Sequence, residues 1–233
     1  MGIAQDVRVL AAMPRFTAID NVYTAMRVAL TLGLNEPKFF VGVFWGENLE
    51  NLLDDAIADG VKYAVAIDCD TVFSADDFVS LYESMEGMPG VSVLSAMMVK
   101  RGDSHPFYEK SLPRDFDGSA VTQVHTGNFG LTFFRVADLL RVAKPWFDAV
   151  ADESGGWRGD GYRPQDIAFW DNLYKAGLVV MQANDVPIGH MQWVVSWPGS
   201  DLAPVHQHVE EWRLEGKPEY AWKRPVNDPN EDT

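Results

Sequence analysis

The N-terminal third of the chain repeats one pattern: an apolar run of strand length followed by a segment with helical spacing of apolar residues. The runs are residues 7–12, 39–45 and 63–67. Helical patterns follow at 17–34 and 49–57, and Ser74 with Asp77 forms a capping-box pattern for a third helix. Consecutive strand–helix units fold into a parallel sheet with right-handed crossovers. The sequence therefore predicts an α/β protein with a mainly parallel central sheet between helices.

The second half of the chain is less regular. It predicts strands at 91–99 and 126–134, and a helix at 164–176 that begins with Pro164 and ends at Gly177. Beyond His190 the chain becomes rich in proline and tryptophan. A length of 233 residues suits one sizeable core. We expect one domain over residues 1–195 and a C-terminal extension, residues 196–233, packed on it.

Charge and cysteine content restrict the possible functions. The formal net charge is -15, from 34 acidic and 19 basic residues, which disfavours unspecific attraction to nucleic acid or anionic lipid. Cys69 is the only cysteine, so an intrachain disulfide and a cysteine-rich metal site are excluded. No stretch has the length and apolarity of a membrane span or a signal peptide. We expect a cytoplasmic protein, in a host cytoplasm if a phage encodes it.

Asp68 and Asp70 stand at the carboxyl end of the apolar run at 63–67. Ligands of parallel α/β sheets lie beyond the carboxyl ends of the strands. Two carboxylates at the end of a buried strand are costly unless a cation or strong hydrogen bonds neutralise them. Mn²⁺ or Mg²⁺ would leave coordination positions for phosphate oxygens. The alternative is that one aspartate caps the next helix and the other faces solvent.

Three segments place this acidic pair in a wider pattern. They read YAVAIDCDTVFSADDF, TGNFGLTFFR and YRPQDIAFWDNLYKAGLVVMQANDVPIGH. Their order and spacing resemble those of GT-A glycosyltransferases, over roughly residues 7–195, and are most similar to small single-domain transferases of phages and other microbes. The resemblance implies the GT-A form of the Rossmann-like fold, a three-layer αβα sandwich, and the transfer of a sugar from a nucleotide donor.

The resemblance also implies roles for single residues. Asp68 would lie near the nucleoside sugar or the metal, Asp70 would bind the metal directly, and His190 would complete the metal shell. Asp166 falls where inverting members carry the catalytic base, although Gln165 stands where glutamate is commoner. Without the resemblance, His190 would be read as a core histidine and Asp166 as an acid that complements a helix dipole.

Further residues are candidates for binding the donor or the acceptor. Asn51 matches an asparagine often found on the helix before the acidic strand, and it could equally be a surface residue. Basic side chains would stabilise charge on the leaving diphosphate, or be ordinary surface cations; they are Lys100, Arg101, Arg158 and Arg163. Rings that could shape a sugar or acceptor pocket are His105, His125, Trp157 and Tyr162.

The expected cofactor is Mn²⁺ or Mg²⁺, and the expected donor is a nucleotide-diphosphate sugar, with a UDP-sugar as the first expectation. The acceptor stays open between a glycan, a small molecule, a protein and, in a phage, a hydroxymethylated DNA base. Lys217, Lys223 and Arg224 could give the extension a local basic channel for DNA, or could simply be solvated.

Other classes can be weighed from the same residues. IDCDTVF also fits a haloacid-dehalogenase-like phosphatase with Asp68 as nucleophile, but that motif usually follows the first strand. A sugar nucleotidyltransferase needs a glycine-rich basic loop that AAMPRFTAID lacks, and a dehydrogenase needs a GxGxxG that the first unit lacks. A binding module with this fold but without turnover stays possible.

Overall fold

The computed structural model describes residues 3–13, 19–41, 44–99, 120–157, 161–198 and 204–219. The chain forms two compact units: residues 1–100 with 105–190, and residues 101–104 with 191–233. The boundary after His190 precedes the one expected at residue 195. The packing of the extension on the domain stays a prediction.

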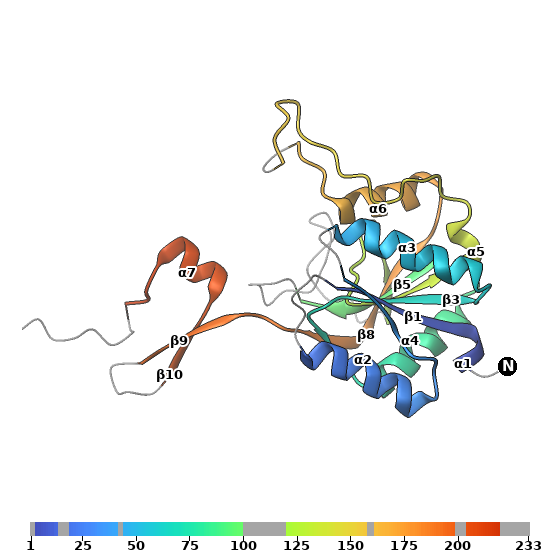
Figure 1. Cartoon of the computed structure of the whole chain (residues 1–233), viewed down its shortest axis with the longest axis horizontal. Coiled ribbons are helices and arrows are strands. Elements are labelled where there is room, and N and C mark those ends of the chain that lie inside the picture. The colour runs from blue at the N-terminus through green and yellow to red at the C-terminus, as the bar shows by residue number, and fades with distance from the viewer. Residues whose placement is uncertain are drawn as a thin grey trace, which may run out of the picture. The chain divides into compact units, whose positions relative to one another are not determined.

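One sheet runs through the first unit (Figure 1). Its strands are β1 (Val7–Met13), β2 (Lys38–Val41), β3 (Tyr63–Ile67), β4 (Thr71–Val72), β5 (Val93–Met98), β6 (Val121–Gln123), β7 (Leu131–Arg135) and β8 (Val180–His190). The order is β2-β1-β3-β7-β5-β8-β4, and β6 also pairs with β8. The pairs β1–β2, β1–β3 and β5–β8 are parallel, whereas β7 runs antiparallel between β3 and β5. The five parallel-running strands therefore end at one edge.

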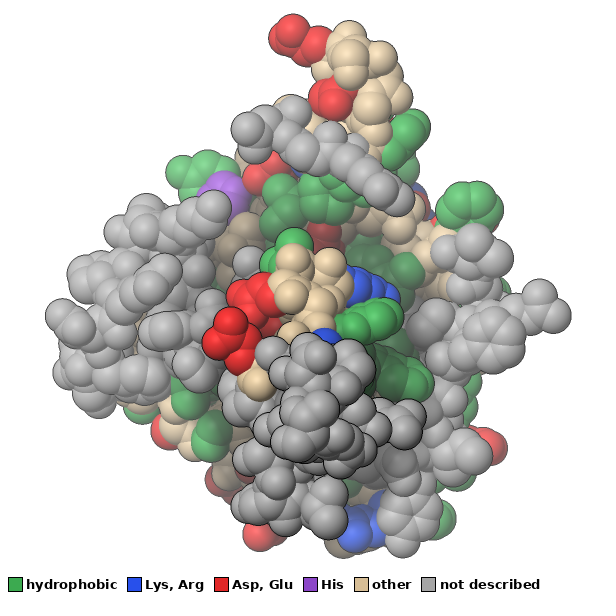
Figure 2. Space-filling model, turned by 90° about the vertical axis from the view of Figure 1, so that its left-hand side faces the viewer, with side chains coloured by type: hydrophobic (Ala, Val, Ile, Leu, Met, Phe, Trp, Pro, Cys, Tyr) green, Lys and Arg blue, Asp and Glu red, His purple; other side chains and the backbone are tan. Residues whose placement is uncertain are grey.

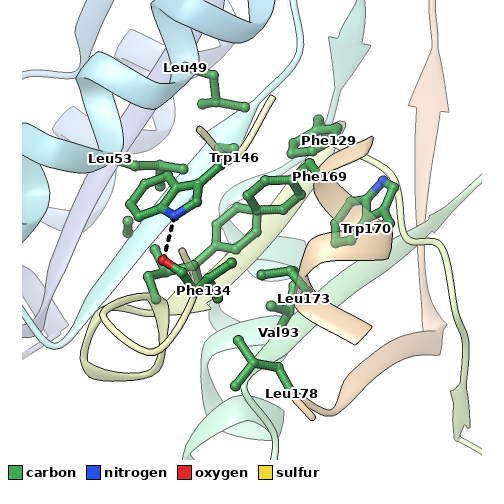
Figure 3. Close-up of a cluster of buried hydrophobic side chains, with 14 of the residues drawn as sticks. Leu49, Leu53, Val93, Phe129, Phe134, Trp146, Phe169, Trp170, Leu173 and Leu178 are labelled. Atoms are coloured by element: carbon green, nitrogen blue, oxygen red, sulfur yellow. Dashed lines mark hydrogen bonds between the residues drawn. The ribbon is translucent and has the colours of Figure 1, made fainter. Parts of the chain in front are cut away.

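Helices cover both faces of this sheet. They are α1 (Ile3–Asp6), α2 (Ile19–Leu32), α3 (Trp45–Ala58), α4 (Ala75–Gly87), α5 (Val136–Leu139) and α6 (Gln165–Lys175). One buried cluster joins α2 and α4 to the sheet, and a second joins α3, α5 and α6 to the opposite face. In the second cluster the rings of Phe147 and Phe169 stack at 4.5 Å between centroids. The buried Trp146 indole donates a hydrogen bond to the Val142 carbonyl at 3.0 Å (Figure 3).

The predicted αβα architecture with a mainly parallel sheet is confirmed. Strand β3 matches the apolar run at 63–67, and its five residues are all buried. The capping box is also present, because the Ser74 hydroxyl accepts from the Asp77 amide at 3.2 Å and Asp77 accepts from the Ser74 amide at 2.7 Å. Two expectations were wrong in detail. Trp45 begins helix α3 and does not belong to the strand predicted at 39–45, and residues 126–130 form a turn before β7, where the sequence predicts a strand from 126.

The second unit contains regular structure of its own. The described residues form an antiparallel hairpin of β9 (Val194–Pro198) and β10 (Pro204–His208), followed by α7 (Val209–Glu215). The buried Gln207 holds these parts together. Its side chain accepts from the Trp197 indole at 3.1 Å and donates to the Gly216 carbonyl at 3.0 Å. Across the part of the chain that is described, no helix has the length and apolarity needed to cross a membrane.

Candidate active site

The loop of Asp68, Cys69 and Asp70, called the acidic loop below, leaves β3 at the carboxyl edge of the sheet. The Asp68 amide donates to the Gly130 carbonyl at 3.4 Å, and the Asp68 carboxylate accepts from the Cys69 amide at 3.0 Å. The Thr71 amide donates back to the Asp68 carbonyl at 3.3 Å, which closes a tight turn into β4. Strand β4 then pairs with the end of β8, where Thr71 lies opposite His190. This pairing brings a residue 120 positions away to Asp70.

Asp70 and His190 form a largely buried pair. Their side chains are 15% and 7% exposed, and the distance from His190 Nε2 to Asp70 Oδ2 is 3.1 Å. On the other side of the ring, Nδ1 lies 2.9 Å from the Val99 carbonyl oxygen. Since a carbonyl only accepts, Nδ1 carries a proton and Nε2 is the nitrogen directed at the carboxylate. His190 therefore belongs to the same site as Asp68 and Asp70.

The residues of this loop fit a divalent cation. Asp68, Cys69 and Asp70 are half-buried and can each offer one ligand atom, and these atoms lie within 4.8 Å of one another. The set combines two hard carboxylate oxygens with one soft sulfur, and the nearby imidazole nitrogen is of intermediate softness. Such a donor set suits Mn²⁺ or a softer ion at least as well as Mg²⁺.

The turn at residues 126–130, before β7, supports the acidic loop through the hydrogen bond from the Asp68 amide to the Gly130 carbonyl. Asn128 is buried; its side-chain nitrogen Nδ2 donates to the Ala96 carbonyl at 2.8 Å, and its side-chain oxygen Oδ1 accepts from the Gly130 backbone amide at 2.9 Å. At Gly127 an added Cβ would lie 2.6 Å from the Ser95 hydroxyl oxygen. Glycine is needed here because the backbone packs too closely for a side chain. The Gly130 carbonyl that anchors Asp68 is thus held in a fixed position.

The beginning of α6 is tied to the beginning of α3. The Gln165 side-chain oxygen accepts from the Gly46 amide at 3.1 Å, and a Cβ at position 46 would lie 2.9 Å from Gln165 Cδ. Gln165 therefore has a positioning role that the sequence did not reveal. Asp166 follows it in the first turn of α6 with an exposed side chain, so a proton acceptor there is open to solvent.

Arg163 and His125 meet at Asp171, which the sequence analysis did not single out. Asp171 lies 3.8 Å from the Arg163 guanidinium and 3.0 Å from His125 Nε2, and the His125 ring packs 4.4 Å from Tyr174. A hollow of about 400 Å³ adjoins this group; it is lined by Gln123, Val124, His125, Tyr174, Leu178 and Val180. Val180 begins β8 and His190 ends it, so this hollow and the acidic loop lie at opposite ends of that strand.

The remaining candidates are placed as follows. Asn51 is exposed in the middle of α3. Trp157 is 60% exposed and meets the half-buried Tyr162 edge to face, with ring centroids 6.0 Å apart. Lys217 lies over the Trp197 ring in the second unit. Candidates outside the described residues are Lys100, Arg101, His105, Arg158, Lys223 and Arg224.

Comparison with known proteins supports the fold. No protein-family model matches the sequence, and no curated protein matches it. Among solved structures, A197 from STIV superimposes with a TM-score of 0.58 at 14% identity, over 86% of this chain and 94% of that one. The likeness is one of fold.

Two further structures are more distant. One is CMP:2-keto-3-deoxy-manno-octonic acid synthetase complexed with CTP, with a TM-score of 0.45 at 9% identity, over 81% of this chain and 92% of that one. The other is a mycobacterial protein, with a TM-score of 0.44 at 9% identity, over 90% of this chain and 89% of that one.

Proposed function

We propose that this protein is a metal-dependent glycosyltransferase of the GT-A type. It transfers a sugar from a nucleotide-diphosphate sugar, with UDP-sugars as the first candidates, to an acceptor hydroxyl with inversion. The observation that carries this proposal is the largely buried Asp70–His190 pair beside Asp68, at the edge of the sheet where the parallel strands end.

The residues of the acidic loop supply the metal site in this proposal. Asp68 and Asp70 bind Mn²⁺ or Mg²⁺, with His190 as the neighbouring nitrogen donor. When bound, the ion offsets negative charge on the departing diphosphate. His190 is oriented for this role by the Val99 carbonyl, an arrangement typical of metal-binding histidines.

Asp166 is the proposed general base. The acceptor oxygen attacks the anomeric carbon, the bond from that carbon to the diphosphate oxygen breaks, and the acceptor proton moves to the Asp166 carboxylate. The Gln165–Gly46 hydrogen bond holds the first turn of α6 in place for this step. A single displacement of this kind inverts the anomeric configuration.

The deciding experiment measures nucleotide release and sugar transfer with a panel of UDP-, GDP- and CMP-sugars in the presence of Mn²⁺. Metal-dependent release of UDP or GDP supports the proposal. Release of phosphate from an aryl phosphate would instead support a phosphatase with Asp68 as nucleophile. Binding of nucleotide without any turnover would indicate a binding module.

Asp166→Asn tests the base. Transfer should slow by about a hundredfold or more while donor and metal still bind. Asp76→Asn is the matched control, because Asp76 is also an exposed acid in the first turn of a helix, α4. If both variants transfer sugar at the wild-type rate, Asp166 is only a helix-terminal acid and the base is another residue.

The acceptor is the least constrained part of the proposal. On the face shown in Figure 2, the described Lys and Arg side chains are scattered among acidic and hydrophobic ones. The net charge of -15 favours a glycan or small-molecule acceptor over a hydroxymethylated DNA base or another polyanion. Transfer to free saccharides, compared with transfer to modified DNA, separates these acceptors.

A further inference from the structure

The hollow beside His125 and Tyr174 is separate from the acidic loop and open to a ligand. Its volume is about 400 Å³, which is within the range of small-molecule sites. The Tyr174 side chain that lines it is 63% exposed. A ligand can therefore reach this hollow from solvent.

The lining of the hollow favours an uncharged ligand. Val124, Leu178 and Val180 are buried and give it an apolar part, whereas the Gln123 amide is exposed and polar. None of the six lining residues is Lys, Arg, Asp or Glu. A phosphate or an ammonium group would therefore meet no permanent charge of opposite sign there.

His125 and Gln123 offer the hydrogen bonds that hydroxyl groups need. His125 Nε2 lies 3.0 Å from Asp171 Oδ1, and the Arg163 guanidinium lies 3.8 Å from the other oxygen of the same carboxylate. Because an ionised carboxylate only accepts, Nε2 carries a proton, and Nδ1 of the neutral ring is then an acceptor for a hydroxyl group. The Gln123 amide adds both a donor and an acceptor.

Tyr174 supplies an aromatic surface next to these polar groups. Its ring packs on the His125 ring with centroids 4.4 Å apart and an angle of 45° between the planes. A pyranose ring carries C–H groups on its faces and hydroxyl groups around its edge. An exposed aromatic ring beside an amide and an imidazole therefore matches both parts of a neutral sugar.

Helix α6 connects the hollow with the proposed base. Asp166 and Tyr174 are both exposed and eight residues apart on this helix, which is about 12 Å along its axis at 1.5 Å per residue. Ile167, Asp171 and Tyr174 follow at positions i, i+4 and i+7, so they form one row that begins next to Asp166. A monosaccharide is too short to touch both ends of this row, whereas an oligosaccharide can lie along it.

We infer that the hollow binds a neutral sugar unit of an oligosaccharide acceptor whose reacting end lies at Asp166. Tyr174 stacks on the sugar ring, and Gln123 and His125 bind its hydroxyl groups. This inference rests on the proposed function and names the class of its acceptor. Affinity for the acceptor should therefore depend on its chain length.

The first test measures saccharide binding without metal or nucleotide. The probes are neutral tetrasaccharides of glucose, galactose, mannose and N-acetylglucosamine, each compared with its monosaccharide in a titration followed by saturation-transfer NMR. The wild type should bind at least one tetrasaccharide about fivefold or more tightly than the matching monosaccharide. A wild type that binds none of the tetrasaccharides would overturn the inference.

Variants of two exposed residues assign that binding to the hollow. Tyr174→Ala and Gln123→Ala should each weaken tetrasaccharide binding by about fivefold or more, whereas Tyr174→Phe keeps the ring and should stay within about twofold of the wild type. Trp212→Ala is the matched control, because it removes an exposed ring from the second unit. Unchanged binding in Tyr174→Ala, or an equal loss in Trp212→Ala, would overturn the inference.

The second test measures sugar transfer with Mn²⁺ and the donor selected from the nucleotide-sugar panel. Tyr174→Ala should raise the KM of the tetrasaccharide acceptor by a larger factor than the KM of the monosaccharide. Wild-type transfer with the same KM for both acceptors would overturn the inference and leave the proposed function standing. Tyr174-dependent saccharide binding in a protein that releases no nucleotide from any donor would overturn the proposed function and keep the hollow as a saccharide site.

Discussion

His190 faces Asp70 through Nε2 at 3.1 Å, while its Nδ1 is held by the Val99 carbonyl at 2.9 Å. The two contacts fix the plane of the imidazole and direct one nitrogen at the carboxylate. A histidine arranged in this way can add a nitrogen ligand to a metal without first turning its ring.

Removing the Asp70 carboxylate should weaken metal binding without unfolding the protein. Asp70→Asn keeps a hydrogen-bonding group beside His190 but lowers the charge of the site, so Mn²⁺ affinity should fall by about tenfold or more. Mn²⁺ binding is measured by calorimetry or electron paramagnetic resonance. Asp185→Asn is the control, because Asp185 is an exposed acid in β8. Equal Mn²⁺ affinity in the Asp70 variant and the wild type would remove Asp70 from the site.

Metal should protect Cys69 from alkylation. Cys69 is half-buried, and its sulfur can lie within 4.8 Å of the Asp68 and Asp70 oxygens. A bound cation should therefore slow its reaction with iodoacetamide, either by binding the sulfur or by covering it. Because the chain has one cysteine, the mass added per molecule reports this residue alone. An alkylation rate that does not change with Mn²⁺ or Zn²⁺ would contradict a metal site in this loop.

The glycine turn should tolerate no side chain at Gly127. In Gly127→Ala the new Cβ would lie 2.6 Å from the Ser95 hydroxyl oxygen and 2.9 Å from the Trp170 ring. Overpacking of this kind should lower the free energy of unfolding by about 1–3 kcal/mol, measured by urea denaturation. Gly87→Ala at the end of α4 has no atom within 4 Å of its new Cβ and should be neutral or slightly stabilising. If Gly127→Ala and Gly87→Ala change the free energy of unfolding equally little, the turn can accommodate a side chain at position 127.

Gln165 should be replaceable by glutamate but not by alanine. Gln165→Ala removes the acceptor of the Gly46 amide and should cost about 1–2 kcal/mol of unfolding free energy, together with sugar-transfer activity. Gln165→Glu keeps an acceptor oxygen and should retain both. Urea denaturation and the transfer assay measure the two effects. If Gln165→Ala transfers sugar normally, the tie between α3 and α6 does not position the active site.

Alkaline pH should loosen the contact between α1 and α4. The Tyr82 hydroxyl donates to the Asp6 carboxylate at 3.0 Å, and burial followed by this hydrogen bond raises the Tyr82 pKa to about 12. The neutral phenol is thus favoured in the folded state, so its contribution to stability is complete below pH 10 and is lost as the pH rises toward 12. Ultraviolet titration of wild type against Tyr82→Phe isolates this tyrosine. An ordinary pKa near 10 for that phenol would contradict the contact.

The layered fold was readable from the sequence because its signals are local. Strand β3 is a continuous apolar run, and the Ser74 cap lies three residues from its partner Asp77. The placement of β7 was not readable, since its antiparallel pairing with β3 and β5 depends on how the chain returns to the sheet. The signal for α3 was ambiguous at Trp45, where an apolar run of strand type continues into the helix.

The sequence predicts only those residues of the candidate site that can be recognised from residue type and order along the chain. Asp68, Asp70 and His190 could be selected, but the β4–β8 pairing that brings the histidine to the acid is a contact over 120 residues. The bond between Gln165 and Gly46 spans 119 residues and leaves no local trace. Asn51, chosen from the resemblance, is exposed in the middle of α3, and its role in binding the donor stays a prediction.

The pairing of Thr71 with His190 has an energetic consequence for ligand capture. A side chain on a loose loop must give up conformational freedom each time a ligand is bound, and that loss subtracts from the affinity. Here the backbone that carries the imidazole is already fixed in a ladder of strands. The backbone of this group therefore loses its conformational entropy during folding, and that loss does not lower the affinity for the ligand.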